Sequence, residues 1–161
     1  MNNIFDQVFK SLKRHKINVI DKDINRPWGG FLVISNNNSE DFINIYFNGS
    51  ITKRLKVSSK LSFKILIIAP NKRLSWQYHN RRSEIWKVVN GKIKVVTSYD
   101  DKERNEKILN YGDEIKLSMG ERHRIIGIDD FAIVAEIWIH TDKDNPSDEN
   151  DIVRVQDDYG R

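Results

Sequence analysis

The stretch WQYHNRRSEIWKVVNGKIKV, residues 76–95, decides the fold and raises the question of function. Gln77 and His79 share one face of an extended strand, because side chains alternate with a period of two. Glu84 follows after a turn, and a hairpin would let its carboxylate return to the same point. Further on, Asn90-Gly91 separates two alternating apolar runs, which predicts a tight hairpin with both central residues at positive φ.

Short β segments continue on both sides of this stretch, separated by Asn-, Gly-, Ser- and Asp-rich turns. They are GFLVIS, FINIYF, ITKRLKV and SFKILIIA before it, and EKILN, DEIKLS, RHRIIG and FAIVAEIWI after it. Many short strands at roughly 8–12-residue spacing are typical of a β-sandwich or barrel.

The two ends of the chain have different patterns. Ile4, Val8 and Leu12 fall on one stripe, which predicts a helix over residues 3–14 that covers an open sheet edge. The segment from His140 onward is polar and predicts a loop leading into a tail. No repeat or linker divides the chain, so we expect one domain.

The composition excludes several classes of protein. Hydrophobic residues make up 39% of the 161 residues and charged residues 31%, as in a soluble globular protein. No apolar run approaches the ~20 residues of a membrane-spanning helix, and the N-terminus lacks the pattern of a signal peptide. There are no cysteines, so neither disulfides nor thiolate metal sites are expected. These features predict a cytoplasmic protein that does not bind membranes.

The net charge of +4 does not identify a nucleic-acid-binding protein. The 27 basic residues are interleaved with 23 acidic ones and form no long tract. A modest positive bias suits a small anionic ligand, such as a phosphate, equally well.

The polar side chains of the opening stretch form a candidate metal site. Gln77, His79 and Glu84 would need a fourth ligand, and His123 follows the Gly120 turn, where a strand could enter beside them. Such a mixed oxygen and nitrogen site suits zinc, iron, manganese, cobalt or nickel. From the residues alone, a histidine satisfied within the core or on the surface remains the alternative.

Two stretches, RLSWQYHNRRSEIWKVVNGKIKV and GDEIKLSMGERHRI, resemble the two motifs of a cupin. More narrowly, they resemble the cupin domain of type II mannose-6-phosphate isomerases, as do RPWGGF at the start of the similarity and NDIVRVQDDYGR at its end. The resemblance implies an all-β cupin fold, a double-stranded β-helix or jelly-roll barrel, with a short N-terminal α-helix. Residues 26–161 would form the cupin domain, and residues 1–25 the helix and lead-in. The guanylyltransferase half that often accompanies this domain has no counterpart, so no nucleotide chemistry is expected.

The resemblance also assigns roles to individual residues. It implies one divalent ion, with zinc as the first expectation and manganese, cobalt, iron or nickel as alternatives, held by Gln77, His79, Glu84 and His123. Lys64 matches a lysine that points into the barrel, with a catalytic or substrate-binding role. Arg82 and Arg124 match substrate-binding arginines beside the ligands, and Arg161 matches a catalytic arginine near the substrate.

The sequence departs from the family pattern at positions next to the site. Asn80, Arg81 and Ile85 stand where the family commonly has histidines. None of the three is a matched ligand, so the predicted metal site is unaffected, while the polarity of the pocket and the substrate preference are less defined.

The implied function is a metal-dependent isomerase that interconverts mannose 6-phosphate and fructose 6-phosphate through an enediol. Lys64 or a hydroxide on the metal could serve as the base. Alternation does not decide whether Lys64 points inward, because both faces of its strand are largely apolar. A non-catalytic sugar- or metal-binding cupin, such as a sensor, is the alternative function, and a purely structural module is a third. The expected partner is a small sugar phosphate, and a homodimer is left open.

Overall fold

The computed structural model describes residues 2–47, 55 and 60–160 of the chain. The helices in this part are α1 (Asn2–Arg14) and α2 (Ser39–Phe47), with a 3-10 turn, η1 (Asn36–Asn38), before α2. The strands are β1 (Val19–Arg26), β2 (Gly29–Ile34), β3 (Leu61–Ile68), β4 (Trp76–Tyr78), β5 (Arg82–Asn90), β6 (Lys92–Ser98), β7 (Asn105–Asn110), β8 (Glu114–Leu117), β9 (Arg122–Gly127), β10 (Ala132–His140) and β11 (Val153–Gln156). The predicted strand ITKRLKV lies outside the described residues apart from Leu55. Neither helix of the described part has the length and apolar character needed to cross a membrane.

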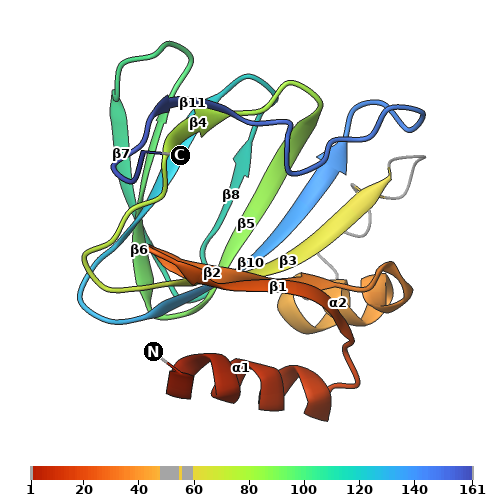
Figure 1. Cartoon of the computed structure of the whole chain (residues 1–161). Helices are drawn as coiled ribbons and strands as arrows, with labels where there is room; N and C mark the ends of the chain where they lie inside the picture. The colour runs from red at the N-terminus through yellow and green to blue at the C-terminus, as the bar shows by residue number, and fades with distance from the viewer. Residues whose placement is uncertain (1, 48–54, 56–59, 161) are drawn as a thin grey trace.

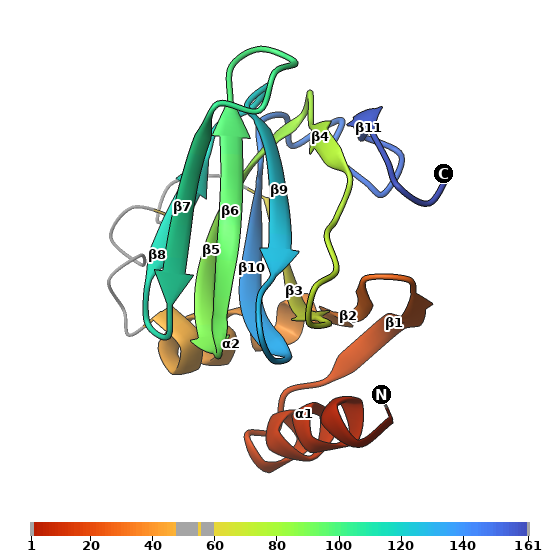
Figure 2. The same cartoon turned by 90° about the vertical axis from the view of Figure 1, so that its left-hand side faces the viewer.

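The strands form two antiparallel sheets that face each other as the walls of a barrel (Figure 1, Figure 2). One sheet has the order β1-β2-β3-β10-β5-β8, and the other has the order β11-β4-β9-β6-β7. From β4 onward the chain changes sheet at every connection except the one between β6 and β7. This alternation is the arrangement of a jelly-roll barrel and confirms the predicted all-β cupin class with a short N-terminal helix.

The prediction of a tight hairpin at Asn90-Gly91 is wrong, because the strands on its two sides do not pair with each other. Asn90 ends β5 and pairs with Ile133 of β10, whereas β6 pairs with β7 and β9 in the opposite sheet. Gly91 has φ of +72°, but Asn90 is not at positive φ. The Asn-Gly pair does mark a sharp turn, but a turn signal does not determine which strands the two arms will pair with.

The segment FINIYF, predicted as a strand, is helical and belongs to α2. Its buried residues Phe42, Ile43 and Phe47 lie on one side of the helix and pack on the outer face of the six-stranded sheet. Two acidic residues in the first turn of α2 favour the start of a helix. Here packing outweighs the β-propensity of the aromatic and β-branched residues.

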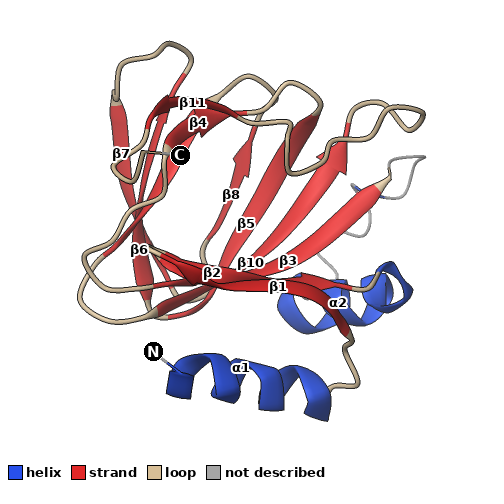
Figure 3. Ribbon diagram, in the orientation of Figure 1, coloured by secondary structure: helices blue, strands red, loops and turns tan. Residues whose placement is uncertain are grey.

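The two faces of β3 pack against different parts of the molecule. Every second residue from Phe63 to Ile67 packs in an outer cluster with α1 and α2, whereas Leu66 and Ile68 belong to a cluster inside the barrel. Lys64 shares the face of Leu66, so its side chain points into the barrel. Helix α1 therefore lies beneath the outer face of the sheet and does not cover a sheet edge as expected (Figure 3).

The C-terminal segment is more than the predicted loop. Val153–Gln156 forms β11, which pairs with β4 and places Arg154 opposite Gln77 (Figure 1). Val153 and Val155 alternate with polar residues, but all four residues of β11 are exposed and the short alternation lies within a strongly polar segment. Its pairing builds the tail into the wall that carries Gln77.

Candidate metal centre and pocket

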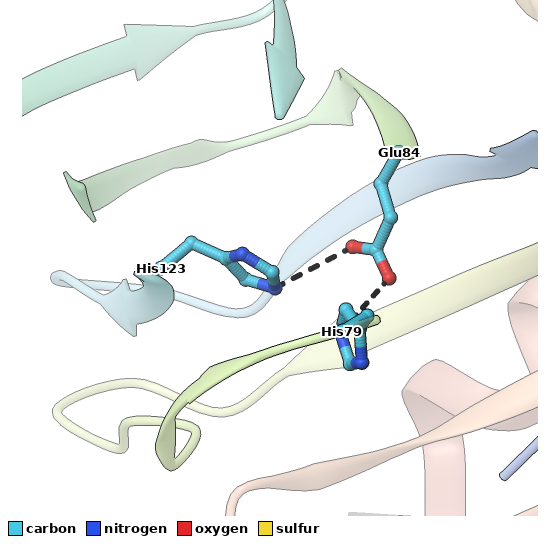
Figure 4. Close-up of side chains that lie close together, drawn as sticks. All are labelled: His79, Glu84 and His123. Carbon is cyan, nitrogen blue, oxygen red and sulfur yellow. Dashed lines mark ion pairs between the residues drawn. The ribbon is translucent and has the colours of Figure 1, made fainter. Parts of the chain in front are cut away.

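Three of the four predicted ligands converge inside the barrel (Figure 4). His79 lies directly after β4, Glu84 in β5 and His123 in β9, and their ligand atoms lie within 4.8 Å of one another. Nε2 of His79 is 3.2 Å from one carboxylate oxygen of Glu84, and Nε2 of His123 is 3.7 Å from the other. We expected β4 and β5 to form a hairpin that returns Glu84 to His79, but this expectation is wrong, because the two strands lie in different sheets. Its side chain instead reaches across the barrel interior from the opposite wall.

Both imidazole rings are oriented by backbone carbonyl groups. Nδ1 of His79 lies 2.6 Å from the carbonyl oxygen of Asp151, and Nδ1 of His123 lies 2.8 Å from that of Glu121. Each Nδ1 therefore carries the hydrogen and donates it, which leaves the lone pair of Nε2 directed at the cluster. Carbonyl partners of this kind commonly orient histidines that bind metals.

The donor set fits a divalent metal ion. Nε2 of His123 is buried and makes no hydrogen bond to any residue that the structure describes. Burial lowers the pKa of His123 to about 4, so the ring is neutral near neutral pH and can act as a ligand. Two imidazoles and a carboxylate are a donor set that zinc and similar ions accept, with positions left for further ligands.

Glu84 is held as a carboxylate by its neighbours. Arg82 donates from Nε to one oxygen at 2.7 Å, and Trp86 donates from its indole nitrogen to the other at 3.0 Å. Burial raises the pKa of Glu84, but His79, Arg82 and His123 together outweigh this effect and hold the pKa well below its usual value. Nη2 of Arg82 also lies 3.0 Å from Nε2 of His79, in a position that a bound ion would take over.

The fourth predicted ligand, Gln77, lies in the same region. It stands opposite His123 in the pairing of β4 with β9 and lines a pocket that also reaches Glu84. Its amide oxygen accepts a hydrogen bond from the hydroxyl of Ser75 at 2.5 Å. The amide oxygen has a second lone pair that this hydrogen bond does not use, and the ligand role of Gln77 stays a prediction.

The predicted substrate-binding cations are not all in this pocket. Lys64 lines it, is 5% exposed, and places Nζ 3.9 Å from the centre of the Trp138 ring while pairing with Glu149. Arg82 also lines it, but its guanidinium is engaged by Glu84 and other protein groups.

Arg124 is not brought to the pocket. Arg124 follows His123 directly on β9, so the two side chains point to opposite faces, and Arg124 donates to Glu103 at 2.8 Å. Arg161 lies outside the described residues, and its role stays a prediction.

Glu136 is a pocket residue that the sequence analysis missed. It lies in β10, is 5% exposed, and accepts a hydrogen bond from the indole of Trp86 at 3.0 Å. Burial and the nearby charge of Glu84 raise the pKa of Glu136 to about 8. The available signal was a single carboxylate within the apolar run FAIVAEIWI.

Asp151 is a second residue whose importance the sequence did not reveal. Besides the carbonyl that orients His79, its carboxylate accepts hydrogen bonds from the backbone N–H groups of Asn80 and Arg81 at 2.9 and 3.0 Å. The hydroxyl of Ser147 donates to it at 2.6 Å. The tail therefore holds the turn between His79 and Glu84 in place.

Solved structures with a similar fold are cupins of diverse function. Oxalate decarboxylase from Bacillus subtilis matches with a TM-score of 0.58 and 15% identity, over 83% of this chain and 29% of that one. KdgF from Halomonas sp. matches with a TM-score of 0.52 and 14% identity, over 77% of this chain and 91% of that one. At these identities the likeness shows the fold alone, and this chain corresponds to less than a third of the decarboxylase. A search of curated proteins gave no match.

A family model gives the closer assignment. The model described as mannose-6-phosphate isomerase C-terminal matches residues 40–157, which include β3 to β11 and all three converging ligands. This match confirms the resemblance inferred from the motifs. The chain belongs to the mannose-6-phosphate isomerase C-terminal family, whose domain is a cupin.

Proposed function

We propose that the chain is a metal-dependent aldose–ketose isomerase that interconverts mannose 6-phosphate and fructose 6-phosphate. The observation that carries the proposal is the buried cluster of His79, Glu84 and His123 beside a pocket that also holds Lys64. Membership in the family supports the choice of substrate. A divalent ion held by the three residues, with Gln77 as a fourth ligand, would polarise the carbonyl and hydroxyl oxygens of the sugar.

The pocket walls supply binding groups for an anionic sugar. Arg26, Lys64 and Arg154 bring positive charge to the lining, which favours a phosphate group. The carboxylate of Glu149 now pairs with Lys64, and a substrate oxygen would replace it. Trp86 and Trp138 line the same pocket and would exclude water from the bound sugar.

Conversion of the substrate tests this proposal directly. Protein reconstituted with zinc is expected to convert mannose 6-phosphate into fructose 6-phosphate, as followed by NMR. A chelator should stop the reaction, and added zinc should restore it. Metal-loaded protein that leaves mannose 6-phosphate unchanged would contradict the proposed function.

A non-catalytic sugar- or metal-binding cupin is the second candidate. The observation in its favour is that protein carboxylates already engage two cations of the pocket, Lys64 through Glu149 and Arg82 through Glu84. Binding of mannose 6-phosphate without turnover would support this alternative. The cytoplasmic location and the homodimer remain predictions.

Lys64 is expected to anchor the substrate, and Lys64→Met tests this role. Loss of a charge-assisted hydrogen bond of about 1.5–3 kcal/mol should lower kcat/KM about 10- to 100-fold, mainly through KM. Metal content should persist, because Lys64 is not a ligand. Lys94→Met is the matched control, since Lys94 pairs with Glu106 at a half-exposed position of the other sheet. Wild-type kinetics in Lys64→Met would remove this residue from the site.

A further inference from the structure

Glu136 carries a buried carboxyl group in a strand whose neighbouring residues are apolar, and these neighbours give the carboxyl group no polar partner. In β10 its neighbours Ala135 and Ile137 are apolar and fully buried. The strand register pairs Glu136 with Lys64 of β3 on one side and with Trp86 of β5 on the other. Its side chain therefore points into the barrel, between the lysine and the indole, and lines the pocket.

The hydrogen bonds of Glu136 leave much of its carboxyl group available. Oε1 accepts from the indole nitrogen of Trp86 at 3.0 Å, and the same N–H lies 3.0 Å from Oε2 of Glu84. Within the described part of the chain, no side chain donates a hydrogen bond to Oε2 of Glu136 and no cation forms an ion pair with it. Lys64, its neighbour across the strands, pairs with Glu149 instead.

This position conflicts with good packing. Burying a carboxyl group without a paired cation costs on the order of several kcal/mol, and an aliphatic residue would suit the interior cluster better. Residues that break local packing rules in this way concentrate at functional sites. Glu136 is also outside the cluster of ligand atoms formed by His79, Glu84 and His123. It therefore lies beside the metal centre and is not part of it.

We propose that Glu136 is the catalytic residue that carries the proton between the first and second carbons of the sugar phosphate. This inference rests on the isomerase function proposed above and assigns Lys64 to substrate binding. Glu84 is unsuited to the task, because Arg82 and Trp86 already engage its two oxygens. Glu149 is unsuited as well, because its side chain is 62% exposed.

The proton transfer balances without any further reactant. The carboxylate of Glu136 takes the hydrogen from the second carbon of mannose 6-phosphate as a proton, and the electron pair of that bond forms the double bond between the first two carbons. The carbonyl electrons move to the first oxygen, which then receives the proton of the second hydroxyl group. Protonated Glu136 returns its proton to the first carbon while the second oxygen becomes the carbonyl of fructose 6-phosphate.

The variant Glu136→Gln tests this role, because it keeps the shape of the side chain and removes the base. We expect kcat to fall at least about 100-fold, the usual size of a general acid–base contribution. Exchange of the hydrogen on the second carbon with deuterated water, followed by NMR, should fall by the same factor. Zinc content and the Kd for fructose 6-phosphate should stay near their wild-type values. Glu136→Asp keeps a carboxyl group and should retain more activity than Glu136→Gln.

A matched control and three outcomes make the test decisive. Glu106→Gln removes a half-exposed carboxylate that pairs with Lys94, and it should leave kcat and exchange unchanged. Wild-type kcat or exchange in Glu136→Gln overturns the inference and leaves the isomerase function standing. Loss of zinc in Glu136→Gln overturns it too, because the residue would then support the metal centre. Absence of turnover in the wild-type protein overturns the proposed function and this inference together.

Discussion

His123→Ala is expected to abolish both metal binding and isomerisation. The imidazole supplies a buried Nε2 with no other partner in the described structure, directed at Glu84 and His79. Hydrogen-bond partners of metal ligands typically contribute 10–100-fold to affinity, so loss of a ligand itself should cost at least about 100-fold. His79→Ala and Glu84→Gln should have effects of the same kind. Titration calorimetry with zinc and elemental analysis after reconstitution measure the loss.

The control for these variants is another histidine. His15 is exposed directly after α1 and is not part of the ligand cluster, so His15→Ala should keep full metal content and turnover. If His123→Ala retains about one zinc per chain, the assignment of the metal centre is contradicted. Zinc loss with unchanged turnover would instead separate the metal from the reaction.

The residues that form the ligand cluster could be predicted from the sequence, but the strand arrangement that brings them together could not. His79 and Glu84 stand close together in the chain, which made a hairpin the simplest explanation. In the structure they come from opposite sheets, because β4 and β5 pair with other strands. A short-range pattern identifies the residues, whereas long-range pairing decides how they meet.

Strand alternation predicts which arginine side chains face the pocket better than the family resemblance does. Arg82 and Glu84 are two residues apart on β5, so they share a face and form an ion pair at 2.7 Å. His123 and Arg124 are adjacent on β9, so only one of them can face the pocket. The two-residue period of a strand was therefore sufficient to predict that Arg124 points away from the pocket that His123 faces.

The direction of Lys64 depended on parts of the chain far from it. Both faces of β3 are apolar, because α1 and α2 cover the outer face while the inner face lines the barrel. The segment of α2 was itself predicted as a strand, so nothing in the sequence identified the outer face. Glu136 was missed for a related reason, since its position opposite Lys64 follows only from the pairing of β10 with β3.

Truncation after Asn150 is expected to impair the metal centre as well as catalysis. The deletion removes the Asp151 carbonyl that accepts from His79 and the carboxylate that accepts from the backbone of Asn80 and Arg81. It also removes β11, the partner of β4. Loss of a partner that orients a ligand costs about 10–100-fold in metal affinity, and each unsatisfied buried group costs about 1–3 kcal/mol in stability. Zinc titration and thermal unfolding would measure the two effects.

Two further variants assign these losses to Asp151 and separate them from the chain end. Truncation after Asp157 keeps β11 and every contact of Asp151 while removing the half-exposed Asp158 partner of Arg73 and the terminal Arg161. It should bind zinc as the full chain does, and Arg161→Ala in the full chain would then separate the contribution of the terminal arginine to turnover from the loss of Asp158 and Tyr159. Asp151→Ala keeps the backbone carbonyl and removes only the carboxylate, so it should lower the unfolding temperature and weaken zinc binding less than the longer truncation. If the chain ending at Asn150 binds zinc and turns over substrate like the full chain, the tail does not position His79.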